Sequence, residues 1–434
     1  MGELSPDIGS MIVSTPRTIP KPLKSIGILL LVVGVAAAAF GFLTSPTRAM
    51  ASFLINFAFW AGVSQGGFMF AVALVVTTGR WGRPLKRVSE AFFVFMPVLY
   101  VLLIVFLVLG GIQIFPWTHE QMPAHKDVYL QPGFFIARLA LGIGLLMLLS
   151  WRFIRSSLRA DMGVAIEQHG ASAFPKFWSQ YTDGWQGTEA EIERSTKSQA
   201  RLGPVIAVAY AFVFSMIAID IEMSLAPHWF ANMFPAWYFA SCFWSGLLGI
   251  GVVSLGGRKW LGATNVFTRH TYHDLGKLCL AFCMFWGYTT FATYLAIWYG
   301  NMTEEIGFIL LRTELEPWSN VSKAVLLLCF FMPFAMFASR GLKKIPAAFL
   351  TAATVALVGI WLCRYIVVMP SVWMDSTLPL GIIEIGMTLG FLGSFILVVF
   401  GFLARVPPIA HTDPFMHPDP DHVHVVPASK AHAH

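Results

Sequence analysis

The chain has 434 residues, of which 56% are hydrophobic and only 12% are charged, and its formal net charge is +6. Soluble domains are about 25% charged, so a water-soluble globule of this composition would lack the charged side chains that cover a protein surface. These values exclude a soluble enzyme, an intrinsically disordered protein and a secreted disulfide scaffold. They indicate a polytopic helical membrane protein.

A membrane-spanning helix needs about 20 apolar residues, and ten segments meet this requirement. The first is longer than the hydrophobic core of a signal peptide and is followed by no evident cleavage site, so we interpret it as a retained helix. The predicted fold class is all-α, with ten transmembrane helices. They cover residues 25–43, 50–78, 90–115, 133–154, 202–225, 234–255, 275–299, 320–339, 345–369 and 380–403.

Lys and Arg are divided unevenly between the loops of this topology, with 23 on the side of the termini and 4 on the other side. Because basic residues accumulate in cytoplasmic loops, we expect both termini in the cytoplasm and no nucleic-acid partner. The predicted organisation is a cytoplasmic N-terminus (1–24), a ten-helix domain in membrane lipid (25–403) and a cytoplasmic tail rich in His and Pro (404–434). The longest loop, 155–201, contains a charged run at 189–194 that predicts a surface helix.

A faint internal repeat suggests how the spans are grouped. Phe59–Gly62 in the second span has the letters FWAG, and Phe243–Gly246 in the sixth has FWSG, and both spans run in the same direction. A parallel duplication would place helices 2–5 and 6–9 in two four-helix bundles, with helices 1 and 10 flanking them. Chance similarity in an aromatic-rich chain is the alternative.

Five ionisable side chains lie well inside predicted spans, where an unpaired charge is costly. At about 1.5 Å per residue, all five are roughly 5–10 Å below the outer edge of the membrane. The matching depths predict two clusters: Arg138 with Asp220 or Glu222, and Arg364 with Glu384. Asp220 and Glu222 are two residues apart on a helix, so we expect them to face different directions.

Two interpretations of these clusters remain open. A carboxylate in a low dielectric exchanges protons near neutral pH, which would suit a proton relay or a quinol-headgroup site. A buried ion pair can instead fix helix register without any turnover of protons. The pair predicted for Arg364 and Glu384 is interpreted as structural.

A second constellation lies near the cytoplasmic ends of the spans. Glu90 begins the third span, and His273, Asp274 and Lys277 begin the seventh. We hypothesise that Glu90, His273 and Asp274 form the inner end of a proton path whose outer end is Arg138, Asp220 and Glu222. The alternative is that Lys277 reaches to the interface and Asp274 stabilises a helix N-terminus. The polar side chains in the middle of the membrane carry only hydroxyl and amide groups, so a proton path would need water molecules to connect them.

No sequence feature indicates a cofactor or metal held by this chain. The five cysteines lie in apolar stretches and form no CxxC pair, and all twelve histidines lie in loops, at helix ends or in the tail. Iron–sulfur, zinc and haem ligation are therefore unsupported. The tail histidines predict a solvated segment: His411, His417, His422, His424, His432 and His434.

Several motifs carry a family resemblance over residues 50–415. Asp220–Leu225 (DIEMSL), followed by Pro227–Phe230, resembles a signature of the membrane subunits of the polysulfide-reductase/NrfD-like superfamily. His273–Lys277 (HDLGK) and its continuation to Asn301 are similar to the second NrfD-like subunit of alternative complex III, a bacterial quinol:cytochrome c (electron acceptor) oxidoreductase. Further matching segments are Phe59–Gly67, Trp81–Pro84, Val368–Ser371, Glu384–Gly386, Leu389–Gly393 and Asp413–Pro414.

The resemblance implies a subunit of the bacterial inner (plasma) membrane without its own redox cofactor, in a complex whose substrate is quinol. The implied partners are a sister NrfD-like subunit, an iron–sulfur/molybdopterin-like protein and a multihaem cytochrome c. Such subunits are associated with proton half-channels, and whether this chain is itself catalytic stays open. The family motifs include Asp220, His228, His273, Asp274 and Glu384. At Ile360, Cys363 and Arg364 the sequence departs from the family pattern, which puts a transferred role for helix 9 in doubt.

The main alternative is a quinol-binding membrane anchor of a molybdopterin oxidoreductase of the polysulfide-reductase type. It would need a quinone pocket at the outer ends of helices 2–5, near Gln65, Arg138 and Asp220. Gln65 and His228 are the candidate quinone-binding residues. A secondary transporter and a purely structural scaffold are further alternatives.

Overall fold

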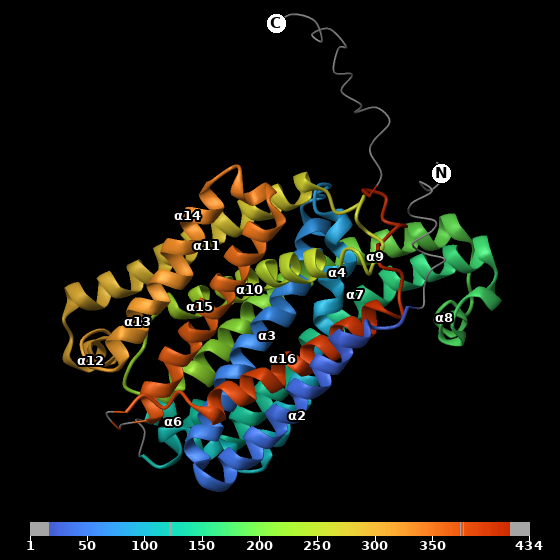
Figure 1. The fold of residues 1–434 in the computed structure, drawn as a ribbon. Coiled ribbons are helices and arrows are strands. Elements are labelled where there is room, and N and C mark those ends of the chain that lie inside the picture. Colours follow the sequence, from blue (N-terminus) through green and yellow to red (C-terminus); the bar gives the residue numbers. More distant parts are fainter. Residues whose placement is uncertain (1–16, 121–123, 374, 376, 417–434) are drawn as a thin grey trace, which may run out of the picture.

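The computed structural model describes residues 17–120, 124–373, 375 and 377–416, and these residues form helices without a β-strand. Ten helical segments are long and apolar enough to cross a membrane, which confirms the predicted fold class. Figure 1 shows their arrangement. The spans are α2 (Lys21–Thr44), α3 (Pro46–Val76), Arg83–Val108 with α4 (Lys86–Phe92) and α5 (Met96–Val108), α7 (Pro132–His169), α9 (Thr188–Ile217) continued to Leu225, α10 (Phe234–Gly257), α11 (Arg269–Gly300), α13 (Trp318–Leu326) continued through α14 (Met332–Ala338), α15 (Pro346–Val372) and α16 (Ile382–Leu403).

Both ends of the described chain lie at the same end of the molecule (Figure 1), which we call the terminal side. The backbone N–H of Arg17 donates to the carbonyl of Ala404 at 2.8 Å, so the segment before α2 is joined to the end of α16. The opposite end, which holds the loop helices α6 (Ala124–Leu130) and α12 (Thr303–Thr313), is called the distal side.

Contacts between the spans form two rings of four. The first ring is made by α3, α4–α5, α7 and α9, and the second by α10, α11, α13–α14 and α15. They contain the same spans as the two bundles that the repeat suggested. α3 packs directly on α10 where the rings meet, while α16 packs along α2 and against α3.

Two glycine contacts bring helix backbones together. A Cβ atom on Gly246 would lie 2.1 Å from the backbone nitrogen of Gly67, so α3 and α10 touch backbone to backbone. A Cβ atom on Gly34 would lie 2.1 Å from the Cα atom of Gly390, which joins α2 and α16 in the same way. Helices in lipid associate through close packing rather than a hydrophobic drive, and small residues permit that packing.

The predicted loop 155–201 is mostly helical. α7 and α9 continue beyond the predicted spans on the terminal side, and the short helix α8 (Lys176–Tyr181) lies between them. Arg159 joins the two extensions because its Nε and Nη2 atoms both donate to Glu191, at 2.9 Å each. The surface helix predicted at 189–194 is part of α9.

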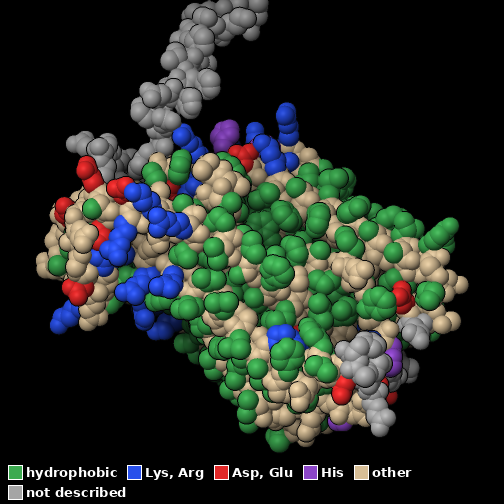
Figure 2. Space-filling model, turned by 180° about the vertical axis from the view of Figure 1, so that it is seen from behind, with side chains coloured by type: hydrophobic (Ala, Val, Ile, Leu, Met, Phe, Trp, Pro, Cys, Tyr) green, Lys and Arg blue, Asp and Glu red, His purple; other side chains and the backbone are tan. Residues whose placement is uncertain are grey.

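The surface of the molecule matches a membrane environment. In Figure 2, hydrophobic side chains cover the middle of the visible face, and most Lys and Arg lie toward the terminal side. α3 is enclosed by other helices over most of its length, whereas α2 and α11 are largely exposed. Polar groups inside α3 therefore meet protein rather than lipid.

Candidate functional site

The first buried ion pair joins α7 to the end of the fifth span. Arg138 donates to both carboxylate oxygens of Asp220, from Nε at 3.0 Å and from Nη2 at 2.9 Å. The Tyr129 hydroxyl donates to Asp220 at 3.0 Å, and its ring lies 3.8 Å from the guanidinium of Arg138. This confirms the predicted cluster and selects Asp220 as the partner of Arg138.

The second buried ion pair lies between α15 and the same segment of the fifth span. Arg364 donates from Nη1 to Oε2 of Glu222 at 3.3 Å, and from Nη2 to the Ser241 hydroxyl on α10. The guanidinium stacks on Tyr238, with its carbon 4.3 Å from the ring centroid. Both charged side chains are about 1% exposed or less, so this pair is enclosed by protein.

The predicted pair of Arg364 with Glu384 is wrong. Glu384 instead accepts from Arg48, from Nε at 2.9 Å and from Nη2 at 2.8 Å, and it accepts the Gly381 backbone N–H at 2.8 Å. The prediction assumed that consecutive helices are neighbours, but α16 packs on α2 and α3 rather than on α15. Glu384 therefore stabilises the N-terminus of α16, where a negative charge is favourable.

The two acids lie in a π-helical turn. Residues Ala218–Glu222 form π-helix between α9 and a short 3₁₀ turn. The wider turn inserts an extra residue, and such turns are frequent at functional sites. Asp220 faces α7 while Glu222 faces α15, which confirms the expectation that two residues so spaced on a helix point in different directions.

A third cluster lies on the terminal side, inside the first ring. Arg87 donates to Glu90 on α4 and to Asp161 on α7 through very short contacts, and to Ser157 at 3.3 Å. Glu90 is fully buried, and its Oε1 atom makes no hydrogen bond with a described residue. The described contacts thus place a cation and two carboxylates in one enclosed group.

The predicted grouping of Glu90 with His273 and Asp274 is wrong. Asp274 is paired with Lys277 at 2.8 Å, and its side chain is 34% exposed. His273 and Asp274 belong to α11 in the second ring, whereas the contacts of Glu90 are made within the first ring. The sequence gives depth along a helix but not the ring to which the helix belongs.

The segment after α16 closes the terminal side of the third cluster. The backbone N–H and hydroxyl of Thr412 donate to Asp161 at 2.9 and 2.7 Å. Asp413 accepts from Arg83 at 2.6 Å and from Lys86 at 2.5 Å. These two cations hold the pKa of Asp413 below its usual range despite its burial.

The prediction of a solvated tail is therefore wrong for its first part. Within residues 404–416, Val406, Ile409 and Asp413 are buried, and His411 is only 4% exposed. Four buried hydrophobic residues and the ion pairs of Asp413 with Arg83 and Lys86 dock this segment. The hydrophobic residues are Ala404, Val406, Ile409 and Ala410. The other tail histidines, from His417 onward, lie outside the described residues.

Between the charged clusters lie buried polar groups. Gln65, in the middle of α3, donates from Nε2 to the Ser150 hydroxyl on α7 at 3.0 Å, and its Oε1 atom makes no hydrogen bond with a described residue. His228 is 72% exposed in a distal loop, 3.6 Å from Glu120. The structure does not bring the two candidate quinone-binding residues together.

Sequence reasoning missed several buried or partly buried charges because it placed them in loops. Arg48, Lys86 and Arg87 lie next to apolar segments, and each binds a carboxylate. The spacing of Arg87 and Glu90, three residues apart on a helix, was the available local signal. The partners Asp161 and Asp413 are far away in sequence and gave no such signal.

Arg312 is a further buried cation that the sequence suggested to be in an outer loop. It donates to the carbonyls of Ile366 and Val367 at 2.8 Å each. Pro370 in α15 has no N–H for the Ile366 carbonyl, so Arg312 satisfies an acceptor that the helix leaves free. Burial lowers the pKa of Arg312, and an arginine nevertheless stays cationic at neutral pH.

Among the described residues, no three His, Cys, Asp or Glu side chains lie close enough together to hold a metal ion.

No protein-family model matches this chain, and no curated protein matches it.

Proposed function

We propose that the chain is an integral membrane subunit of a quinol:cytochrome c (electron acceptor) oxidoreductase of the alternative complex III type, and that it conducts protons. Its motifs support this assignment, together with buried acids toward both sides of the molecule. In this proposal the termini are cytoplasmic in a bacterial inner membrane. The redox groups belong to the partners: an iron–sulfur/molybdopterin-like protein, a multihaem cytochrome c and a sister NrfD-like subunit.

The observation that carries the proposal is a series of buried polar side chains between the two sides of the molecule. On the distal side it begins with Glu222, Arg364 and Ser241. On the terminal side it ends with Glu90, Arg87 and Asp161. The buried pair of Gln65 and Ser150 lies between these groups.

The gaps in this series can be estimated from helix geometry. Ser150, Ser157 and Asp161 lie seven and four residues apart on α7, hence on one face, with steps of about 10 and 6 Å. Cys242, next to Ser241, contacts Gly62, which lies about one turn or 5 Å from Gln65 along α3. Water molecules between the side chains would bridge steps of this size.

Glu222 and Glu90 are the groups best suited to carry a proton. Each has one carboxylate oxygen bound by an arginine and a second oxygen, Oε1, without a hydrogen bond to a described residue. A neutral carboxylic acid would place a proton on that oxygen. The adjacent arginine stabilises the ionised form, whereas burial disfavours a charge, so the two effects oppose each other.

Asp220 is suited to a structural role instead. Arg138 and Tyr129 donate to both of its oxygens. The contacts therefore shift the outer end of the hypothesised path from Asp220 to Glu222, and its inner end from His273 and Asp274 to Glu90 and Asp161.

The test compares Glu222→Gln, Glu90→Gln and Asp220→Asn in the assembled complex. In liposomes, proton release or uptake is measured together with quinol turnover. We expect the two Gln variants to lose proton translocation by about tenfold or more, as for removal of a proton-transfer group. Asp220→Asn serves as the matched control and should translocate normally once assembled.

An unchanged ratio of protons to electrons in both Gln variants would contradict proton conduction by this chain. Loss in all three variants together with loss of assembly would indicate a structural defect. For that reason, the amount of complex and its quinol oxidation rate are measured on the same samples.

A groove in the protein surface between transmembrane helices favours the second candidate, a quinol-binding anchor. It has a volume of 860 Å³ and lies between the α2–α16 pair and helices α3 and α5. Its lining is mostly apolar and includes the aromatic side chains of Phe53, Phe106 and Phe391. The groove reaches Gln113 near the distal side. A photoreactive quinone should label these residues if the groove takes quinol, and labelling only of another subunit would exclude this candidate.

A further inference from the structure

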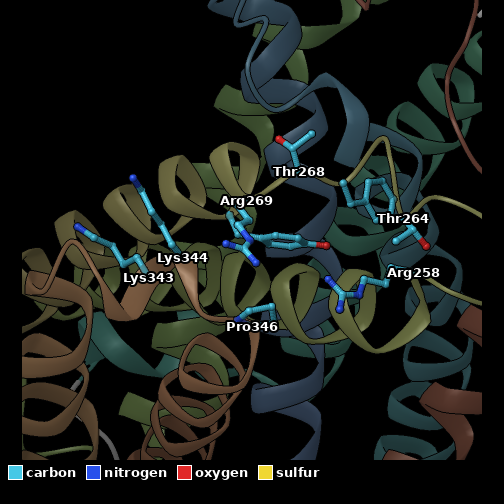
Figure 3. A pocket seen from close by; sticks show the side chains of 9 residues that line it. Arg258, Thr264, Thr268, Arg269, Lys343, Lys344 and Pro346 are labelled. Carbon is cyan, nitrogen blue, oxygen red and sulfur yellow. The ribbon is translucent and has the colours of Figure 1, made fainter. Parts of the chain in front are cut away.

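A second cavity lies on the terminal side of the other ring, far in sequence from the charged clusters described above. It has a volume of 210 Å³ and is formed by the terminal ends of α10, α11 and α15 and the loops before them. In Figure 3, Arg269 lies between Arg258 on one side and Lys343 and Lys344 on the other. Thr264, Thr268, Phe267, Tyr272 and Pro346 complete the lining.

The charges of this cavity are not balanced within the described part of the chain. Arg258, Arg269, Lys343 and Lys344 line it, and no acidic residue does. Asp274, an acid near the start of the same helix α11, is already paired with Lys277 at 2.8 Å. The cations of the third cluster differ, because Arg83, Lys86 and Arg87 each bind a carboxylate.

Lys343 holds one of the four cations against the core of the protein. Its side chain is about 5% exposed, and its stem packs over Gly276, where a Cβ atom would lie 2.9 Å from it. Burial together with the charges of Lys277 and Arg340 lowers the pKa of Lys343. Four cations around one cavity repel one another, so a bound anion would stabilise this arrangement.

Two neutral groups add hydrogen-bonding capacity at the cavity wall. The Tyr272 hydroxyl is buried near Ser254 and Arg258 but has no well-formed hydrogen bond with a described residue. The N-terminus of α11, a helix of 32 residues, opens at the cavity after Thr268. The free N–H groups and dipole of a helix N-terminus favour an anion.

We propose that this cavity binds the phosphate of an anionic phospholipid headgroup. Basic pockets between transmembrane helices on the positively charged side of a membrane protein are suited to such headgroups. The volume is below the roughly 300–1,000 Å³ of pockets that enclose drug-sized ligands. It would therefore hold the headgroup while the acyl chains stay outside.

The rim of the cavity favours a lipid over a free phosphate ion. Leu342 and Ile345 flank the two lysines and are 37% and 50% exposed. Exposed apolar side chains next to clustered cations match the boundary between headgroups and acyl chains. The proposal is independent of electron transfer and of proton conduction.

The test uses the full-length chain in nanodiscs of phosphatidylcholine with a minor fraction of phosphatidylglycerol. Native mass spectrometry counts the phosphatidylglycerol retained on the chain. The variant Arg258→Gln with Arg269→Gln removes two cavity cations, and Arg152→Gln with Arg201→Gln is the matched control. Both control residues are exposed on the terminal side. We expect retention to weaken roughly 25-fold in the cavity variant, about fivefold per cation, and by a clearly smaller factor in the control, whose two residues are exposed.

A single variant, Lys344→Gln, guards against misfolding because Lys344 is exposed and its replacement leaves the core intact. It should weaken retention about fivefold. Equal retention in wild type, cavity variant and control would overturn the proposal. Inorganic phosphate is added in a separate series without phosphatidylglycerol. If it raises the unfolding temperature of the wild type while phosphatidylglycerol is not retained, the site binds free phosphate and the lipid assignment is wrong.

Discussion

The ion pairs of Asp220 and Glu222 differ although the two acids are two residues apart. Asp220 accepts hydrogen bonds at both oxygens, and its partner Arg138 is 13% exposed beside Tyr129. Glu222 is held by Arg364 at one oxygen only, in a site where neither charge reaches solvent. The comparison teaches that two carboxylates in nearly the same place along a span can have different surroundings, one with both oxygens bound and one with a single oxygen bound.

The strongest test of this comparison removes the arginine of the enclosed pair. Arg364→Leu leaves Glu222 buried without a counter-charge, and breaking a buried pair in this way costs about 3–5 kcal/mol. We expect the free energy of unfolding, measured by denaturant titration in detergent micelles, to fall by that amount.

The double variant Arg364→Leu with Glu222→Leu separates the pair from the packing around it. Replacing both charges by apolar groups of similar volume is often neutral, so stability should largely return. A double variant as unstable as the single one would show that packing of Arg364 on Tyr238, and not charge, is the cause.

The same change at the other pair should have a smaller effect. In Arg138→Leu, Asp220 keeps the hydroxyl of Tyr129, and the site lies near the distal surface where water can approach. The expected loss is about 1–3 kcal/mol, as for one unsatisfied buried group. A loss equal to or larger than that of Arg364→Leu would remove the distinction between the two pairs.

The docked segment 404–416 extends the comparison to the terminal side, where pH is the variable. The pKa of Asp413 is lower in the folded protein than in the unfolded chain. Its contribution to docking is therefore fully present above its ordinary pKa of about 4 and declines as the pH falls through the lower folded value.

Hydrogen exchange of the peptide that contains Thr412 measures this docking. After correction for intrinsic rates, protection should be similar at about pH 6 and about pH 5, and reduced near pH 3. Asp413→Asn should lose protection at every pH, since it no longer neutralises Arg83 and Lys86. Protection that is unchanged in this variant would mean that the apolar residues alone dock the segment.

The smallest effect is expected at the predicted residues that the structure places at the surface. Asp274→Asn breaks a pair with Lys277 that is partly exposed. Surface changes of this kind stay within about 0.5 kcal/mol, and proton translocation should not change. A loss of proton translocation in Asp274→Asn would indicate that α11 takes part in the proton path. It would then weaken the proposal that Glu90 forms the inner end of that path.

The sequence predicted more of the fold than of the site. Hydropathy predicted all ten spans, because each needs a continuous apolar segment. Depth predicted that Arg138 pairs with Asp220 or Glu222, since α7 and α9 are consecutive antiparallel neighbours, and the structure selected Asp220. The same reasoning failed for Glu384, because α16 lies beside α2, and for Glu90, because α4 and α11 lie in different rings.

The sequence by itself determined that this is a membrane protein, how many segments can span the membrane, and which five ionisable residues lie well inside those segments. These properties follow from local composition, since a charge in lipid is costly wherever the helix lies. Only the tertiary structure decided the partners of those charges. Pairing depends on which helices pack together and on a docked C-terminal segment that carries Asp413 to Lys86.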